Sequence, residues 1–298
     1  MAAPNILILL HERDRSALDI GYWIWTMREV WEEMGLRVDV VRGSRRAGPA
    51  DLLFPHIDLT VTPPEYVALF DRYPLVVNRS TIDHSKRAIS SNLVRPGDRW
   101  AEPVIVKTDR NSGGLRDRQL LGTFPQLAST RLRMLLGLRT PEIAGDGPID
   151  FASVQCIPPW RYPIYDSIDA VPVEAFRNPA LVVERFLPER SGETYSLRSY
   201  VFLGNRFHFE RLGSSQPIVK AHTAVGDEEI GVDERVVPVR RRLRLDYGKL
   251  DYVVRNDGIT VLDANTTPGY GTAAKDDVLV QRARRLAHGI REWLRIPP

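Results

Sequence analysis

The sequence has almost no cysteine and no long apolar segment. Its single cysteine, Cys156, has no partner for an internal disulfide, which predicts a reducing, cytoplasmic location. No apolar run approaches the ~20 residues that cross a bilayer, so no membrane partner is expected. The apolar run Ile6–Leu10 lacks the basic segment and the small-residue cleavage site of a signal peptide, and is interpreted as a buried strand.

Two common nucleotide-binding loops and a strong excess of charge are also missing. No Gly-x-Gly-x-x-Gly follows the first predicted strand, and no Gly-x-x-x-x-Gly-Lys-Ser/Thr occurs anywhere. The net charge is only +3, and the densest basic cluster, between Arg240 and Arg244, has no interleaved aromatic residues. A solvated helix face is therefore favoured over a nucleic-acid patch, and a nucleic-acid partner is not expected.

The first 85 residues alternate between strand and helix patterns. A helix over about residues 19–34 has apolar side chains at three-to-four spacing, and strand-like runs surround it at residues 5–10, 38–41, 52–54 and 75–77. This rhythm predicts a small parallel α/β domain. The helix contains three tryptophans. Core packing is the favoured interpretation, while a pocket lining or a dimer interface is the alternative, which allows a homodimer.

From about Pro103 the pattern changes to short strands separated by turns. Predicted strands lie at residues 104–107, 181–184, 199–202, 206–209, 252–254 and 260–262. Turn-like sequences at residues 203–206 and 255–258 predict two hairpins. Residues 141–170 have no clear periodicity and are expected to be irregular. An amphipathic helix is predicted over residues 276–294.

The strand-like segments near residue 250 and residue 262 carry the strongest chemical signal. Asp263 and Asn265 are two residues apart on one predicted strand, so their side chains point to the same face. Asp251 lies on the adjacent hairpin strand and could face them. Carboxylate and amide oxygens suit Mg²⁺. The alternative is that all three are strand-end residues on a solvated face, and the spacing does not decide between these interpretations.

A lysine and a glycine loop give a second signal. Lys107 ends the apolar strand 104–107, and the loop with Ser112, Gly113 and Gly114 follows. This arrangement can place an ammonium group and backbone N–H groups beside phosphate oxygens. A surface hairpin whose lysine extends to solvent is the favoured alternative for this segment taken alone.

Two further strands carry polar groups. The apolar strand ending at Glu184 opens into a polar stretch with Glu189, which could hold an adenine through the backbone and a ribose through a carboxylate. Arg198 interrupts a later strand, where a guanidinium could bind a phosphate through two hydrogen bonds. The alternatives are a buried strand followed by a loop, and a salt bridge between Arg198 and a carboxylate.

Taken in this order, the segments resemble the ATP-grasp superfamily. The resemblance covers about residues 86–271 and is most specific over Leu250 to Gly269. It implies an α/β and α+β architecture in which a small parallel α/β domain, residues 1–85, precedes a two-lobed ATP-grasp domain, residues 86–298. Lobe one would span about residues 86–180 and lobe two about residues 181–298.

The resemblance also implies roles for individual residues. Catalytic roles fall to Lys107, at the phosphates, and to Arg198, at the transferring phosphoryl group. ATP would be bound by Lys86, Lys107, Ser112, Gly113, Gly114, Glu184, Arg185, Phe186, Leu187 and Glu189. Mg²⁺ would be bound by Asp251, Asp263 and Asn265. Asp263 stands where the family usually has glutamate, which makes bridging of two ions less certain.

The implied activity is an ATP- and Mg²⁺-dependent ligase that forms ADP. It would activate a carboxylate as an acyl phosphate for attack by an amine, with small-molecule or peptide substrates. A small-molecule kinase on the same fold and a nucleotide-binding protein without turnover are the alternatives. His208, Lys220 and His222 are candidate bases, although a plain surface or core role is favoured for each histidine.

Overall fold

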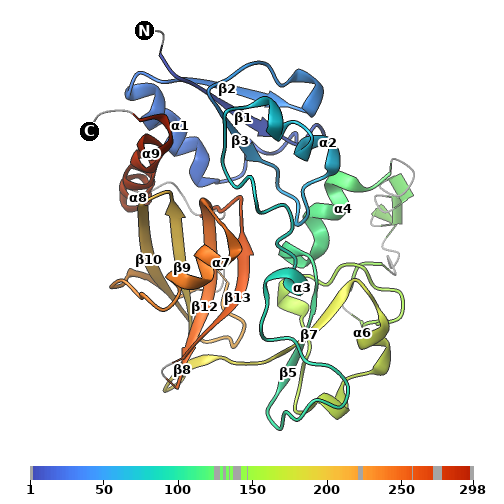
Figure 1. Cartoon of the computed structure of the whole chain (residues 1–298). Helices are drawn as coiled ribbons and strands as arrows, with labels where there is room; N and C mark the ends of the chain where they lie inside the picture. The colour runs from blue at the N-terminus through green and yellow to red at the C-terminus, as the bar shows by residue number, and fades with distance from the viewer. Residues whose placement is uncertain are drawn as a thin grey trace.

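The protein is described by a computed structural model, in which an N-terminal domain lies above two lobes (Figure 1). The described residues are 3–123, 128–129, 132–133, 135–136, 142–145, 147–220, 224–256, 258–270 and 277–295. None of the helices within these ranges is long and apolar enough to cross a membrane.

The N-terminal domain is a four-stranded parallel sheet in the order β2-β1-β3-β4. Its strands are β1 (Asn5–Leu10), β2 (Arg37–Arg42), β3 (Leu52–His56) and β4 (Leu75–Val76). All of β1 is buried because both faces of the sheet are covered. One face packs against α1 (Trp23–Glu33) and the other against the segment that begins with α2 (Pro64–Val67).

The predicted tryptophan helix is confirmed as a core element. Trp23 and Trp31 of α1 are 2% and 0% exposed and pack in the same cluster as Ile6 and Ile8 of β1. The helix begins at Trp23, later than the pattern predicted, because residues 14–20 form turns. Its apolar stripe is therefore used for packing within the chain.

The first lobe has a small antiparallel sheet in the order β6-β5-β7. It contains β5 (Val104–Thr108), β6 (Ile164–Tyr165) and β7 (Leu181–Arg185), with the helices α3 (Lys86–Ile89), α4 (Leu115–Leu121) and α6 (Val173–Arg177) around it. Because β7 pairs with β5, this sheet extends to Arg185, slightly beyond the lobe boundary expected near residue 180.

The second lobe is built on a larger antiparallel sheet. Its order is β11-β10-β9-β12-β13. The short strand β8 pairs with the first residues of β9. The strands are β8 (Glu189–Ser191), β9 (Thr194–Leu203), β10 (Arg206–Ser214), β11 (Gly226–Glu229), β12 (Tyr247–Arg255) and β13 (Gly258–Asn265). Both predicted hairpins form, β9–β10 and β12–β13. The outer face is covered by α7 (Val237–Leu243).

The basic cluster on α7 is partly structural. Arg240 donates hydrogen bonds to the carbonyls of Gly204, Leu245 and Asp246. Its guanidinium also lies 4.0 Å from the centre of the Phe202 ring. This arginine therefore fastens α7 to the sheet, while the neighbouring arginines of α7 face solvent.

The last helices return to the N-terminal domain. The predicted helix over residues 276–294 is divided into α8 (Asp277–Ala287) and α9 (Arg291–Leu294) by a 3-10 turn. At this turn Gly289 lies so close to the Leu203 carbonyl that an added Cβ would be 2.0 Å from its oxygen. Trp31 Nε1 donates to the Ala287 carbonyl over 2.8 Å, so α8 closes the core over α1 (Figure 1).

Short 3-10 helices complete the fold. They lie at Ser44–Arg46, Phe70–Arg72, Asn111–Gly114, Pro159–Arg161, Ile168–Ala170 and His288–Ile290. The segment around residues 141–170 has little regular structure where it is described, as predicted.

Candidate functional site

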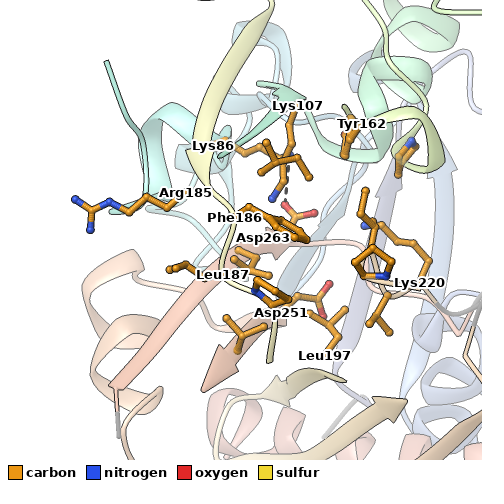
Figure 2. Close-up of a pocket in the computed structure, with 18 of the residues that line it drawn as sticks. Lys86, Lys107, Tyr162, Arg185, Phe186, Leu187, Leu197, Lys220, Asp251 and Asp263 are labelled. Atoms are coloured by element: carbon orange, nitrogen blue, oxygen red, sulfur yellow. Dashed lines mark ion pairs between the residues drawn. The ribbon is translucent and has the colours of Figure 1, made fainter. Parts of the chain in front are cut away.

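A pocket lies between the small sheet of the first lobe and the inner face of the second lobe's sheet. It opens to solvent, and the space between its walls, with the open solvent included, is about 780 Å³. Its lining comes from β5, the segment after β7, the strands β9, β12 and β13, and residues 217–220. Figure 2 shows charged groups gathered at its centre and apolar side chains around them.

The register of the second lobe's sheet brings the two predicted metal carboxylates together. Asp251 of β12 lies directly opposite Asp263 of β13, and both line the pocket. On the other side of Asp251, Ser199 of β9 donates its hydroxyl to Asp251 Oδ1 over 2.6 Å. Lys249 Nζ lies 3.0 Å from the same oxygen. Burial acts to lower the pKa of Lys249, but the carboxylates of Asp251 and Glu210 outweigh it and raise this pKa.

Three lysines face these carboxylates from other elements. Lys86 of α3 is 3% exposed, and its Nζ lies 3.8 Å from Asp263 Oδ1. Lys107 of β5 and Lys220, after β10, also line the pocket (Figure 2). Burial lowers the pKa of Lys220, while Asp263 and Asp251 act in the opposite direction. The pocket thus holds a compact set of cations beside two anions.

Lys107 is paired with a fully buried carboxylate. Its Nζ lies 2.8 Å from Glu184 Oε2, and the Glu184 side chain is 0% exposed. Ser90 Oγ donates to the other Glu184 oxygen over 2.6 Å. Burial alone would raise the pKa of Glu184, but Lys107 and Ser90 outweigh burial and lower it. Glu184 therefore does not line the pocket. It holds the Lys107 ammonium group in place through their ion pair.

The segment after Glu184 lines the pocket. Arg185, Phe186 and Leu187 all contribute to the wall. The Arg185 side chain extends away from the charged centre (Figure 2), and its guanidinium lies 4.6 Å from the Trp100 ring centre. Phe186 and Leu187 belong to an apolar slot. The other apolar residues of this slot are Ile105, Leu197, Ile218, Val219, Val253 and Leu262.

The glycine loop is only partly at the pocket. Ser112, with a φ of 50°, lines it, whereas Gly113 and Gly114 do not. A Cβ added at Gly113 would lie 2.4 Å from the Ile157 carbonyl oxygen. Glycine is thus required at this position because the backbone around Ile157 packs directly against it.

Arg198 and Glu189 are not brought to the pocket. Leu197 and Ser199 of β9 face the inner side of the sheet, so Arg198 between them faces the outer side. Its guanidinium binds both carboxylate oxygens of Glu189, with a shortest distance of 2.6 Å. Glu189 Oε2 also accepts from the Val254 N–H over 2.8 Å. The salt bridge stated as the alternative for Arg198 is what the structure contains.

The oxygen donors at the pocket, Asp251 and Asp263, and the neighbouring Asn265, which is not part of the lining, fit Mg²⁺. Asp251 and Asp263 are adjacent, and the Asn265 amide oxygen follows Asp263 on the same face of β13. Over the described ranges no cluster of three or more histidine, cysteine, aspartate or glutamate residues could hold a metal. Mg²⁺ does not need such a cluster, because it usually binds one or two carboxylates and completes its shell with water and substrate phosphates.

Several lining residues had no clear signal in the sequence. Tyr162 and Pro159 come from the irregular segment, and Ile218 follows the end of β10. Lys220, one of the three candidate bases, does line the pocket. Tyr162 shares a hydrogen bond with Thr108 Oγ1, and burial raises its pKa to about 12.

The two histidines suggested as bases are not placed at the pocket. His208 is buried on β10, 3.5 Å from Glu210 Oε2, and does not line the pocket. His222 lies outside the described residues.

Comparisons with known proteins agree with this architecture. No protein-family model and no curated protein sequence matches the chain. Among solved structures, an ATP-grasp RimK domain protein from Sphaerobacter thermophilus is 14% identical, with a TM-score of 0.50, over 98% of this chain and 100% of that chain. A D-alanine–D-alanine ligase from Bacillus anthracis is 14% identical, with a TM-score of 0.53, over 98% of each chain. The structure of a D-alanine–D-alanine ligase from Bacillus anthracis complexed with ATP is 11% identical, with a TM-score of 0.52, over 98% of each chain.

These likenesses show that the chain has the ATP-grasp fold, as the sequence predicted. Sequence identities this low establish the fold only.

Proposed function

We propose that this protein is an ATP- and Mg²⁺-dependent ligase that joins a carboxylate to an amine and releases ADP and phosphate. The observation that carries the proposal is the charge pattern of the pocket. The paired carboxylates Asp251 and Asp263 face Lys86, Lys107 and Lys220 across a cavity whose remaining wall is largely apolar. A nucleoside triphosphate has the matching pattern, with an apolar base at one end and an anionic, metal-binding chain at the other.

Each part of the pocket has a role in this proposal. The adenine lies in the slot beside Phe186 and Leu187, where burial of a flat apolar ring is favourable. The ammonium groups of Lys86, Lys107 and Lys220 bind phosphate oxygens and neutralise the charge that develops during transfer. Ser112 supplies a hydroxyl at the same end. Arg198 and Glu189 have no place in this scheme, because they pair with each other on the outer face of the sheet.

Asp251, Asp263 and Asn265 would hold Mg²⁺. The ion would supply additional charge neutralisation of the triphosphate when bound. The shorter side chain of Asp263, compared with glutamate, is compatible with a single shared ion. The protein's own contribution is to hold the triphosphate between the two lobes, away from bulk water.

The chemistry follows in two balanced steps. A carboxylate oxygen of the substrate attacks the γ-phosphorus of ATP, the bond to the β-phosphate oxygen breaks, and ADP leaves with an acyl phosphate formed. An amine nitrogen then attacks the acyl carbon, the carbon–oxygen bond to phosphate breaks, and the amine loses a proton. Lysines around the phosphates stabilise both leaving groups.

Calorimetric titration of ATP in the presence of Mg²⁺ tests the nucleotide site. The wild type is expected to bind, and Asp263→Asn to bind at least about tenfold more weakly, because a charged ligand of the ion is lost. Asp71→Asn is the matched control, since Asp71 is 95% exposed and distant from the pocket lining. Wild-type protein that binds no ATP, or an Asp71→Asn loss equal to that of Asp263→Asn, would refute the assignment.

Trapping with hydroxylamine tests the reaction class. A ligase that forms an acyl phosphate gives a hydroxamate together with ADP when the correct carboxylate is present. ADP release with a phosphorylated acceptor and no hydroxamate would identify a kinase. ATP binding without ADP release under a broad set of carboxylates and amines would favour a nucleotide-binding protein without turnover.

A further inference from the structure

The Asp58 carboxylate, in the loop after β3, joins all three parts of the chain. It accepts a hydrogen bond from the Tyr22 hydroxyl of the N-terminal domain over 2.5 Å. Arg116 Nε, from α4 in the first lobe, donates to the same oxygen over 2.6 Å. The other oxygen accepts from Thr267 Oγ1, just after β13 of the second lobe, over 2.8 Å. The side chain is thus held by donors from three directions.

Thr267 carries this contact directly to Asn265. Its backbone N–H donates to Asn265 Oδ1 over 2.8 Å. Because an N–H group can only donate, the bond fixes which end of the Asn265 amide faces Thr267: it is the oxygen. Thr267 Oγ1 also lies 3.1 Å from Asn265 Oδ1 and 2.8 Å from Asp58 Oδ1. Because a hydroxyl has only one hydrogen, donation to Asp58 leaves one of the two lone pairs of the Asn265 oxygen for a cation beside Asp263.

The segment that contains Thr267 is held at both ends against the N-terminal domain. Trp23 N–H donates to the Pro268 carbonyl over 3.2 Å, and Tyr270 N–H donates to the Gly21 carbonyl over 2.8 Å. Thr267 itself is 2% exposed. The position of its backbone N–H therefore depends on the N-terminal domain, and its hydroxyl contact with Asp58 is protected from water.

We propose that Asp58 is a positioning residue for the cation end of the pocket. Through Thr267 it holds the Asn265 amide oxygen where a divalent ion shared with Asp251 and Asp263 would bind. The inference rests on the proposed function, since it assigns Asn265 to that ion. The N-terminal domain contributes no residue to the described pocket lining. The inference nevertheless gives this domain a direct influence on the affinity for the cation.

The test measures Mn²⁺ binding to the full-length protein by electron paramagnetic resonance, with ATP present and without any second substrate. Thr267→Val removes the hydroxyl but keeps the backbone N–H, and is expected to weaken Mn²⁺ binding about fivefold, the range of one lost hydrogen bond. Thr267→Ser keeps the hydroxyl and is expected to restore binding. Asp58→Asn combined with Thr267→Val is expected to bind Mn²⁺ no more weakly than Thr267→Val alone, because both changes reach the cation through the same Asp58–Thr267 contact, whereas the loss of the Arg116 ion pair affects stability.

Thr81→Val is the matched control. Thr81 Oγ1 also makes a contact between distant parts of the chain, donating to the Leu243 carbonyl over 2.6 Å, but away from the pocket. Its loss is expected to reduce thermal stability without changing Mn²⁺ affinity. Equal Mn²⁺ affinity in Thr267→Val and wild type, or equal weakening in Thr81→Val, would overturn the inference.

The outcome for the wild type separates the two proposals. If wild-type protein binds ATP and Mn²⁺ but the Thr267 variants do not differ, Asp58 has only a structural role and the proposed function stands. If wild-type protein binds no Mn²⁺ with ATP, the proposed function itself fails and this inference with it. Should Asp58→Asn not fold, the Thr267→Val and Thr267→Ser pair carries the test alone.

Discussion

Replacing Lys107 by methionine should reveal two separable roles of this side chain. Glu184 is 0% exposed and lies 2.8 Å from the lysine, so that ammonium group is its nearest counterion, with the Ser90 hydroxyl as a neutral donor and Lys86 as a more distant cation. Removing one partner of such a buried pair costs about 3–5 kcal/mol, because the other charge stays buried without its counterion. We expect Lys107→Met to lose about that much stability at neutral pH and to bind ATP weakly.

The double variant Lys107→Met with Glu184→Gln separates the two effects. Glutamine is neutral and its oxygen can still accept the Ser90 hydroxyl, so most of the lost stability should return, leaving a deficit of about 1–2 kcal/mol. ATP affinity should not return, because the cation at the phosphates is still missing. Urea unfolding followed by tryptophan fluorescence and calorimetric ATP titration measure the two quantities on the same samples.

The pH dependence gives an independent check. In the wild type the pKa of Glu184 is lowered, so its stabilising contribution is present above the unfolded value of about 4.3 and is lost as pH falls through the folded value. In Lys107→Met, burial is no longer opposed by lysine and raises the pKa. The deficit should then be fully present at neutral pH, shrink as pH falls, and disappear only below the lowered pKa of Glu184 in the wild type. A deficit below about 1 kcal/mol at neutral pH, typical of an exposed pair, would refute this reasoning.

Two other substitutions have outcomes that the structure determines. Burial lowers the pKa of Lys220, so its charge is costly in the unliganded protein; Lys220→Met should raise the Tm by about 2–4 °C while weakening ATP binding, and a lower Tm in a scanning-calorimetry comparison would contradict this. Burial lowers the pKa of His56 to about 4, so folding stability is lost as pH falls from about 6.5 towards 4. In His56→Leu, the folding stability lost between pH 6.5 and pH 4 should be about 3 kcal/mol smaller than in the wild type, as measured by urea unfolding at each pH. If the two proteins lose the same stability, His56 is not the source of the pH dependence.

The sequence predicted strands and hairpins well because their signals are local. The β12–β13 hairpin has apolar runs on each side of a turn sequence. Alternation predicted that Asp263 and Asn265 share a face and that Asp251 could face them, and the structure has Asp251 opposite Asp263. Pairing between distant strands has no such signal. Nothing near residue 181 indicates that β7 joins β5, a strand that ends much earlier in the chain, at Thr108.

The position of Arg198 shows where the alternation of side chains along a strand does not predict which face of the sheet a residue occupies. A strand that is half buried reveals its inner face through its apolar residues. β9 is buried on both faces, since Leu197 packs towards the pocket and Tyr200 towards α7. The sequence therefore contains no information on which side Arg198 faces. Lys220 could not be placed either, because it follows a strand end in a segment without periodicity, and its position depends on the neighbouring lobe.

The contact between Trp31 and Ala287 has a consequence for folding during translation. These residues are 256 positions apart, and the core that covers one face of the first sheet includes Ala283, Leu286 and Ile290 from the last helices. A ribosome releases the N-terminus long before it synthesises α8. During that interval the first domain exposes apolar surface that its own residues cannot cover, so it can finish folding only when the last helix emerges. We therefore expect nascent chains that are stalled just before residue 277 to bind chaperones and to be cleaved by proteases more readily than the full-length chain.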